Sequence, residues 1–320
     1  MTPTGGFTGA LSPDAVLTGI DGVMWNEYTR EMQPGYIRSS DSFFFNQGDT
    51  VGVGFIADED SDIGDFDKAD EQEDFMNTDT WVGNQKTHYS QKYYKQIPVS
   101  DEAFRADMIG KRDNIGRKIG EHARQTQDKE ALQNTYADAF AGSVNTTPDG
   151  QALASNSHVT LKGITVDNLE TGALDPDNLW TAQNSLANQK GQDGDAGGHL
   201  FEGLAVPYNL YKTAKEVMNS TKEADSAENN LNIFETDFGQ VRIGASIFLD
   251  STYNLATYAS TSYHLIGRNH QIARKVFYGL TTTLIPPTNS SNDTYLYRAK
   301  LHEVCYPGTW SGYLGSNGTT

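Results

Sequence analysis

The segment from residue 95 to residue 150 constrains the fold of this chain most, because a short strand runs directly into a long helix. In KQIPVS, Ile97 and Val99 alternate with polar residues, and Pro98 favours an edge strand because proline donates no ladder hydrogen bond. Ser100 is a good N-cap, and the two acidic residues after it suit the positively polarised first turn of a helix. The sequence therefore predicts an edge strand followed at once by a helix.

The predicted helix runs from about Asp101 to His122 and has one narrow apolar stripe. Its members recur at steps of four, seven and four residues: Phe104, Met108, Ile115 and Ile119. Much of the rest is basic: Arg105, Lys111, Arg112, Arg117 and Lys118. Glycine stands at positions 110, 116 and 120, and each costs roughly 0.5 to 1 kcal/mol against alanine in a helix. We expect this helix to lean on a neighbour, with the glycines leaving room for another backbone.

The net charge and the amino-acid composition of the chain argue against several classes of function. The formal net charge of -18 argues against a protein that grips nucleic acid, because that affinity depends on Lys and Arg neutralising phosphates. The 320 residues suggest about two domains, and 37% hydrophobic residues suffice for a core. No apolar run is long enough to span a membrane and the start does not resemble a signal peptide, so we expect neither a membrane protein nor an exported one. Cys305 is the single cysteine, and its strand-like surroundings favour a packed apolar residue.

Turn formers and scattered aromatic residues in residues 1–41 predict an extended arm that packs on another surface. Residues 42–97 contain two strand-prone flanks around an acidic stretch, residues 57–79, and this pattern predicts a long hairpin with too little apolar surface to be stable alone. Further along we expect a second helical piece around residues 128–140, a helix capped by Asp175, a flexible GQDGDAGG loop, the strand LFEGLAVP and the helix YNLYKTAKEVMNS. The remainder is predicted as mainly strand: QVRIGASIFL, SYHLIG, KVFYGLTTTLI and TYLYRAKLHEVCY.

This order of elements resembles the major capsid proteins of tailed double-stranded DNA phages, which have the Johnson (Hong Kong ninety-seven) fold. Residues 149–158, DGQALASNSH, are similar to a DGxxLFSxxH segment of Mu-type head subunits, with Ala154 in place of the phenylalanine. Residues 200–220 resemble the strand, proline and helix of the axial domain, and residues 230–259 resemble the sheet that follows. The resemblance implies an α+β chain with this division: N-terminal arm 1–41, E-loop 42–97, peripheral domain with spine helix 98–149, axial domain 150–289 and a return strand of the peripheral domain 290–320.

The same resemblance implies a major capsid protein that self-assembles, as pentamers and hexamers, into an icosahedral or prolate head around the DNA genome. The expected location is the virion, with assembly in the host cytoplasm. No long helical scaffolding segment precedes the arm, which implies a separate scaffolding protein or its prior removal; a portal and a decoration protein are further expected partners. Packaged DNA is expected only in non-specific proximity. The lysine to asparagine crosslink of one relative has no assignable residues here.

Two other function classes stay open. One is an encapsulin-like nanocompartment shell on the same fold, which would enclose protein cargo. The other is an acidic, β-rich binding protein or hydrolase unrelated to capsids. Particle size separates the last from both shells, because a monomer on gel filtration would support it and a megadalton particle would not.

The sequence offers no complete catalytic or metal signature. Asp58, Asp60 and Asp62 resemble the start of a calcium loop, but Gly64 falls one position late and Ala69 cannot supply the bidentate ligand, so a solvated acidic loop is favoured. No HExxH, GxSxG or GxxxxGK[ST] occurs, and His158 is interpreted as a structural turn residue. We therefore expect no enzymatic activity, no cofactor and no metal. The candidate packing and assembly residues are Phe104, Met108, Ile115, Ile119, Arg112, Arg117, Asp58, Asp60 and Asp62.

Overall fold

The computed structural model describes residues 13–30, 35–49, 52–60, 82–100, 111–221, 232–250, 260–287 and 294–319, and for residues 13–19 and 111–112 it describes the backbone alone. The chain forms two compact units, each built from three segments. Unit 1 contains Met1–Met32, Gln91–Gln127 and Val276–Glu303. Unit 2 contains Gln33–Ser90, Asp128–Lys275 and Val304–Thr320.

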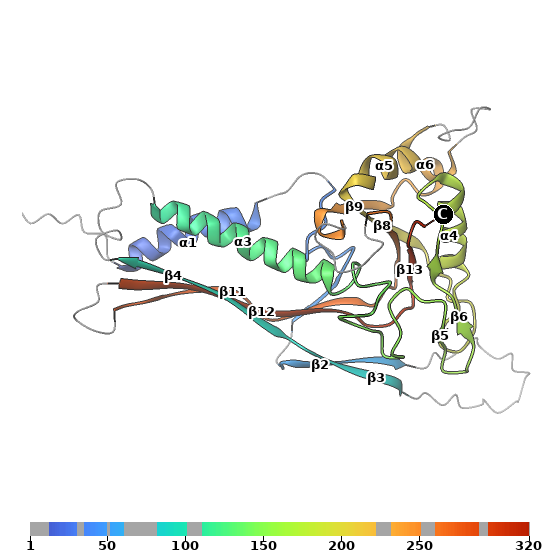
Figure 1. Cartoon of the computed structure of the whole chain (residues 1–320), viewed down its shortest axis with the longest axis horizontal. Coiled ribbons are helices and arrows are strands. Elements are labelled where there is room, and N and C mark those ends of the chain that lie inside the picture. The colour runs from blue at the N-terminus through green and yellow to red at the C-terminus, as the bar shows by residue number, and fades with distance from the viewer. Residues whose placement is uncertain are drawn as a thin grey trace, which may run out of the picture. The chain divides into compact units, whose positions relative to one another are not determined.

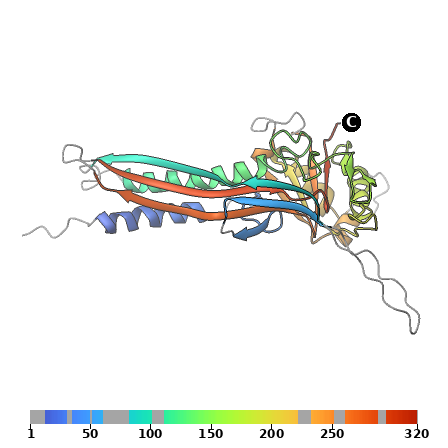
Figure 2. The same ribbon diagram turned by 90° about the horizontal axis from the view of Figure 1, so that it is seen from below.

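Long strands and two helices make up unit 1. The strands are β4 (Gln91–Ser100) and most of β11 (Ile272–Ile285) and β12 (Thr294–Pro307), in a sheet with the order β1-β11-β12-β4. β4 pairs antiparallel with β12 along its whole length, from Gln91 opposite Glu303 to Ser100 opposite Thr294. The helices α1 (Pro13–Thr29) and α3 (Lys111–Gln133) cover one face of these strands (Figures 1 and 2). β4 is an edge strand, as the proline within it predicted.

Two sequence expectations for the helices α1 and α3 differ from the structure. Residues 13–29, expected to be part of an extended arm, form the helix α1. The helix α3 is continuous to Gln133, where a second helical piece was expected around residues 128–140, and residues 134–141 are turns. Helix α1 and helix α3 contribute Ile20, Met24 and Ile119 to one buried cluster with Val99, Leu280, Tyr297, Ala299 and Leu301 of the strands. An apolar core of its own therefore holds unit 1 together.

Unit 2 is built around a five-stranded mixed sheet with the order β7-β13-β10-β8-β9. Its strands are β7 (Leu169–Glu170), β8 (Phe201–Pro207), β9 (Arg242–Ser246), β10 (Tyr263–Gly267) and β13 (Tyr313–Ser316). The pairs β8–β9 and β13–β7 are parallel, whereas β10 is antiparallel to both β8 and β13. The helices of this unit are α4 (Pro176–Ala187), α5 (Tyr211–Asn219) and α6 (Ile233–Asp237).

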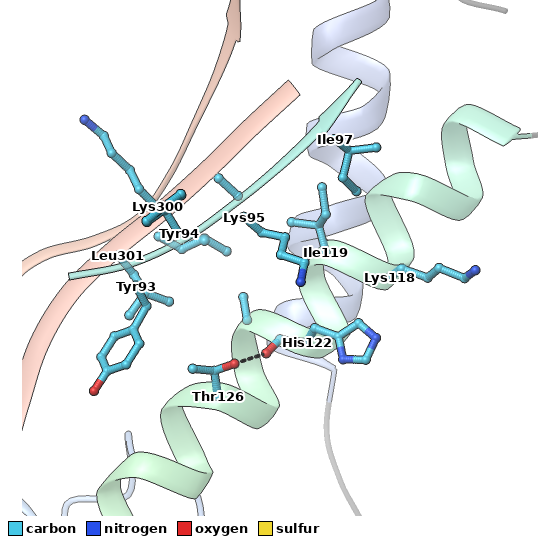
Figure 3. A pocket seen from close by; sticks show the side chains of 13 residues that line it. Tyr93, Tyr94, Lys95, Ile97, Lys118, Ile119, His122, Thr126, Lys300 and Leu301 are labelled. Carbon is cyan, nitrogen blue, oxygen red and sulfur yellow. Dashed lines mark hydrogen bonds between the residues drawn. The ribbon is translucent and has the colours of Figure 1, made fainter. Parts of the chain in front are cut away.

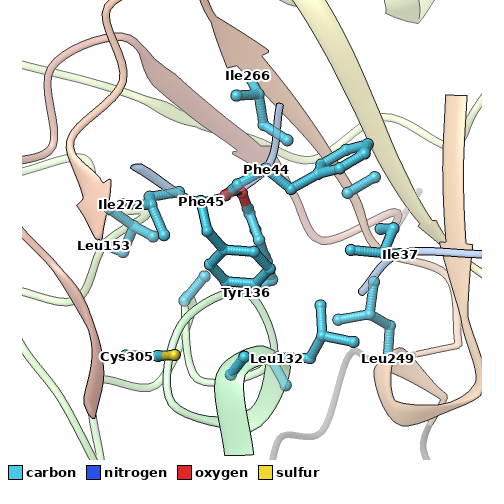
Figure 4. Packing of buried hydrophobic residues seen from close by; sticks show 14 of the residues in the cluster. Ile37, Phe44, Phe45, Leu132, Tyr136, Leu153, Leu249, Ile266, Ile272 and Cys305 are labelled. Carbon is cyan, nitrogen blue, oxygen red and sulfur yellow. Dashed lines mark hydrogen bonds between the residues drawn. The ribbon is translucent and has the colours of Figure 1, made fainter. Parts of the chain in front are cut away.

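The predicted helices that begin at Pro176 and around Tyr211 and the predicted strands at residues 201–207 and 263–267 are confirmed. Two segments differ from the expectation: Ile247–Leu249, predicted as strand, form a 3-10 helix, and Ile233–Asp237, in the segment that resembles a sheet, form α6. The Asp175 carboxylate accepts a hydrogen bond from Asn178 N and caps α4, with proline at the next position. Leu179 and Leu186 of α4 pack with the apolar residues of β8 in one core cluster. A second cluster surrounds Tyr136, whose hydroxyl donates to the Phe44 carbonyl oxygen at 2.5 Å (Figure 4). Cys305 is buried in that second cluster, as expected of an apolar packing residue.

The predicted hairpin is present as β2 (Gly54–Asp60) paired antiparallel with β3 (Val82–Tyr89). Residues 61–81, which include Asp62 and most of the acidic stretch, lie outside the described residues. Short strands β1 (Asn46–Asp49), β5 (His158–Val159) and β6 (Thr165–Val166) complete the element order. The C-terminal residues 304–320 belong to unit 2 and contribute β13 to its sheet. The assignment of residues 290–320 to a return strand of the peripheral domain stays a prediction.

Candidate assembly site

Close contact between α1 and α3 depends on two glycines of the GRKIG sequence. A Cβ atom at Gly116 would lie 2.7 Å from the backbone oxygen of Ile20, and one at Gly120 would collide with the backbone oxygen of Met24. The two glycines are four residues apart and so lie on the same face of α3, against α1. The room for a neighbouring backbone that the glycines predicted is thus occupied by α1.

A groove of about 470 Å³ opens in unit 1 between α3 and the strands (Figure 3). Apolar side chains line it from both sides, namely Ile97, Ile119, Ala123, Leu280, Ala299 and Leu301. Its polar lining consists of Tyr93, Tyr94, Lys95, Lys118, His122, Thr126 and Lys300. None of these lining residues is acidic, although acidic residues far outnumber basic ones in the chain. The groove therefore suits an apolar segment that carries negative charge.

The base of the β2–β3 hairpin rests on unit 2 through buried polar side chains. Lys86 Nζ donates to the carbonyl oxygen of Thr146 at 3.0 Å and to the hydroxyl of the same residue at 2.6 Å. Glu59 is fully buried, and one carboxylate oxygen accepts from Asn84 Nδ2 at 2.9 Å. His88 stacks on Tyr306 with ring centroids 4.4 Å apart. Polar contacts thus add to the apolar cluster in which Phe55 and Ala57 of β2 pack with Tyr306.

Burial perturbs the ionisable groups at this base. It lowers the pKa of His88 to about 4, and the nearby Lys86 ammonium acts in the same direction. Burial also raises the pKa of Glu59, against the hydrogen bond from Asn84, and lowers the pKa of Lys86. Each shift favours the uncharged form of a group that the docked hairpin removes from water.

The two ends of the DGQALASNSH segment contact each other. His158 is buried on β5, and its Nδ1 lies 2.6 Å from Asp149 Oδ2, which is a correction to its interpretation as a turn residue. Asp149 also accepts hydrogen bonds from the Thr147 hydroxyl and the Gln151 amide. Burial raises the pKa of Asp149, but the hydrogen bonds from His158 and Thr147 outweigh it, so this pKa lies below its usual value. Trp310 stacks on the His158 ring with centroids 5.4 Å apart.

The structure places only some of the candidate residues. Ile119 is buried in the core of unit 1, and Ile115 packs against that core. Arg117 is exposed and donates to Asn114 Oδ1 at 2.9 Å. Asp58 and Asp60 are exposed on β2. The side chains of Phe104, Met108, Arg112 and Asp62 lie outside the described residues. A role in assembly stays a prediction for all of them.

Sequence reasoning missed the polar base of the hairpin and the Asp149–His158 pair. On β2, Glu59 is buried while its neighbours Asp58 and Asp60 are exposed, as the two-residue period of a strand requires. Because all three side chains are acidic, the sequence does not show which of them is buried. Among the described residues, no group of three or more His, Cys, Asp or Glu side chains could hold a metal ion. Within the same residues, no helix has the length and apolar character of a membrane span.

The chain is similar to a known protein family over most of its length. A family model described as phage capsid protein matches residues 84–290, which is more than half of the chain. The chain belongs to the phage capsid protein family. A search of curated proteins found no match to it. Membership of this family implies a structural rather than an enzymatic role.

Solved structures share the fold of this capsid protein at low sequence identity. The mature capsid of bacteriophage PhiM1 matches with a TM-score of 0.55 and 11% identity, over 89% of this chain and 89% of the other. A virus-like particle from Pyrococcus furiosus matches with a TM-score of 0.53 and 11% identity, over 93% of this chain and 98% of the other. The capsid of a native GTA particle matches with a TM-score of 0.52 and 11% identity, over 91% and 94%. These likenesses establish the α+β Johnson fold of tailed-phage capsid proteins for this chain.

Proposed function

We propose that this capsid protein is the major shell subunit of a phage head and assembles with copies of itself as pentamers and hexamers around double-stranded DNA. The family match over residues 84–290 carries the proposal. The structure supports it through surface that a single chain leaves open: Ile56 and Tyr89 of the hairpin are 59% and 65% exposed, and the groove of unit 1 is apolar. Obligate assemblies cover such surface, burying about 2,000 to 5,000 Å².

We also propose the division of the chain within that shell. Unit 1, with α3 as the spine helix, corresponds to the peripheral domain, and the five-stranded sheet of unit 2 corresponds to the axial domain. The β2–β3 hairpin and residues 61–81 between its strands correspond to the E-loop. Similarity to Mu-type subunits rests on residues 149–158 alone and stays a prediction.

The acidic stretch 57–79 has Lys68 as its only local cation, so its negative charge needs outside compensation. The groove of unit 1 supplies Lys95, Lys118 and Lys300 beside an apolar floor. We propose that a neighbouring subunit's acidic stretch is compensated there during assembly. A scaffolding protein, a portal and a decoration protein are further proposed partners, and the host cytoplasm is the proposed place of assembly.

Electron microscopy and static light scattering of the purified full-length chain, with and without a candidate scaffolding protein, test the function. Shells or rings of five or six subunits are expected. A chain that stays monomeric with scaffold supplied would contradict the proposal. Lys118→Glu, at an exposed position of the groove, should reduce the yield of particles, whereas Lys129→Glu, at an exposed position of α3 outside the groove lining, should not.

The second candidate is a nanocompartment shell, which the match to a virus-like particle from Pyrococcus furiosus favours at the level of the fold. The contents of purified particles separate the two functions. Nuclease-protected DNA in particles from infected or induced cells supports the phage head. A stoichiometric cargo protein without DNA supports the nanocompartment.

A further inference from the structure

The two faces of the β2–β3 hairpin have an unusual distribution of side chains. The face toward the rest of unit 2 carries the ionisable residues Glu59, Lys86 and His88, which are buried or half-buried, beside the apolar Phe55 and Ala57. The opposite face exposes Ile56 and Tyr89. A two-stranded hairpin is marginal without a supporting surface, and here that support combines a small apolar cluster around Tyr306 with polar groups whose charge can change. Its attachment should therefore respond to protonation.

Among these three ionisable residues, His88 is the one at which a buried charge is most costly. It is only 5% exposed, and its Nε2 atom has no hydrogen-bond partner among the described residues. The His88 ring stacks on Tyr306 of β12 with ring centroids 4.4 Å apart. Asn145, in the loop that follows α3, hydrogen-bonds the His88 ring. A protonated ring would need an acceptor for the Nε2 proton, and removal of an unpaired buried charge from water is costly.

We propose that protonation of His88 releases the β2–β3 hairpin. The neutral ring keeps the hairpin packed on the rest of unit 2, and the protonated ring does not. We call this arrangement the His88 latch. The released state would satisfy the imidazolium with water. It would also free Lys86 from the loop that contains Thr146. This inference concerns one chain and does not rest on the proposed assembly.

The charges that face His88 from each neighbouring element set the direction of the effect. On its own strand Lys86 is the nearest cation and disfavours a second positive charge. On the loop, Asp138 attracts Lys86, and on β2, Glu59 favours its own protonated form. On β12, burial and then Asp58 raise the pKa of Tyr306, so this ring remains neutral. The stack of an imidazolium on Tyr306 would be attractive, but it offsets only part of the cost of burial.

The pH window follows from the docked and released states of His88. Its pKa falls from 6.5 in water to about 4 when docked, so docking is fully stabilised above pH 6.5 and this stabilisation is lost as pH falls toward 4. Between pH 8 and pH 5 the docking equilibrium should fall by about 30-fold. The pKa of Glu59 is raised on docking, so Glu59 acts in the opposite direction as pH falls. Asp149, with a lowered pKa, keeps its contribution in this window.

Hydrogen–deuterium exchange of the purified full-length chain tests the latch. Protection factors, corrected for the intrinsic pH dependence of exchange, are compared at pH 8 and pH 5 for the amides of β2 and β3. We expect protection of the wild-type hairpin to fall by at most about 30-fold, because Glu59 offsets part of the His88 effect, with the five-stranded sheet of unit 2 unchanged. Unchanged protection of the hairpin, or an equal loss in the five-stranded sheet, would overturn the proposal.

Two variants separate the latch from a general effect of acid. His88→Phe keeps a ring on Tyr306 but cannot be protonated, so its hairpin should lose no protection between pH 8 and pH 5 and should gain some from Glu59. His302→Phe replaces a half-buried histidine of β12 in unit 1 and should keep the wild-type response. Glu59→Gln removes the opposing group and should steepen the loss. A persistent response in His88→Phe contradicts the latch.

A direct measurement covers the case in which His88→Phe does not fold. Nuclear magnetic resonance of histidine-labelled wild-type chain follows the protonation of the His88 ring. The ring should take up its proton at the same pH at which the hairpin loses protection. Protonation near pH 6.5 with the hairpin still protected would overturn the proposal.

Discussion

At the scale of single residues, buried ionisable side chains in unit 2 shape local structure. Asp149 and His158 stand nine residues apart and join the ends of a loop, with Trp310 stacked on the histidine ring. The Asp149 carboxylate has hydrogen bonds from three neighbours, which explains why it remains ionised despite its burial. Removal of one member of such a set leaves the others buried without partners.

Asp149→Asn should destabilise unit 2 at pH 7 by about 1 to 3 kcal/mol, because the buried His158 loses a charged partner. The pKa of Asp149 is lowered in the folded chain, so its stabilisation is present above its usual value of 3.8 and is lost as pH falls through the folded value. Urea unfolding should therefore show a large difference from wild type at pH 7 and a small one well below pH 3.8. Asp60→Asn, at an exposed position, is the control and should change little at either pH.

Ile119→Ala should cost about 2 to 5 kcal/mol, because the side chain is 5% exposed and its removal leaves a cavity in the core of unit 1. Ile56→Ala makes the same chemical change at a side chain that is 59% exposed, and its effect should stay within about 0.5 kcal/mol. Chemical denaturation followed by circular dichroism, which reports on both units, compares them. Equal effects of the two substitutions would contradict the placement of Ile119.

At the scale of elements, the α1–α3 pair combines low helix propensity with close packing. The glycines that weaken α3 in isolation allow α1 to approach its backbone, so tertiary contact compensates for the propensity loss. The same argument explains why the sequence predicted that α3 needs a neighbour but not which segment supplies it. The helix α1 was not predicted, because the scattered aromatic residues and turn formers in residues 1–41 favour an extended arm.

Gly120→Ala should destabilise unit 1 by about 1 to 3 kcal/mol, because the new methyl group would collide with the Met24 carbonyl and outweigh the gain in helix propensity. Gly22→Ala on α1 adds the same methyl group where no atom lies within 4 Å, and it should stabilise by about 0.5 to 1 kcal/mol. Thermal unfolding of both variants gives the comparison. Stabilisation by both substitutions would show that the helices do not approach as described.

Sequence patterns predicted elements better than they predicted contacts between elements. The edge position of β4 followed from Pro98, and the start of α4 followed from Asp175 and the proline after it, because both signals are local. The burial of Glu59 depends on partners brought from residues far along the chain, and the closure of His158 on Asp149 depends on a loop conformation. A pattern of charges cannot specify either.

At the scale of the whole molecule, the acidic stretch and the basic groove suggest electrostatic control of assembly. Deletion of residues 62–79, joined by a short glycine–serine turn, should leave both cores folded, because this stretch is rich in acidic residues and poor in apolar ones. Assembly should weaken, and the difference from wild type should be largest at low salt, where charge attraction is least screened. Light scattering across a salt series measures assembly, and circular dichroism checks the fold. Loss of the folded core in the deletion variant would contradict the placement of residues 62–79 outside the two cores.

The interleaved division of the chain has a consequence for its synthesis. Unit 1 needs β11 and β12, and the sheet of unit 2 needs β13 between β7 and β10. Since β13 ends at Ser316, the ribosome must synthesise the chain through Ser316 before the sheet of unit 2 can close, and through Glu303 before unit 1 is complete. A nascent chain that is shorter than this lacks the closed core of unit 2 and cannot present it to a neighbouring subunit.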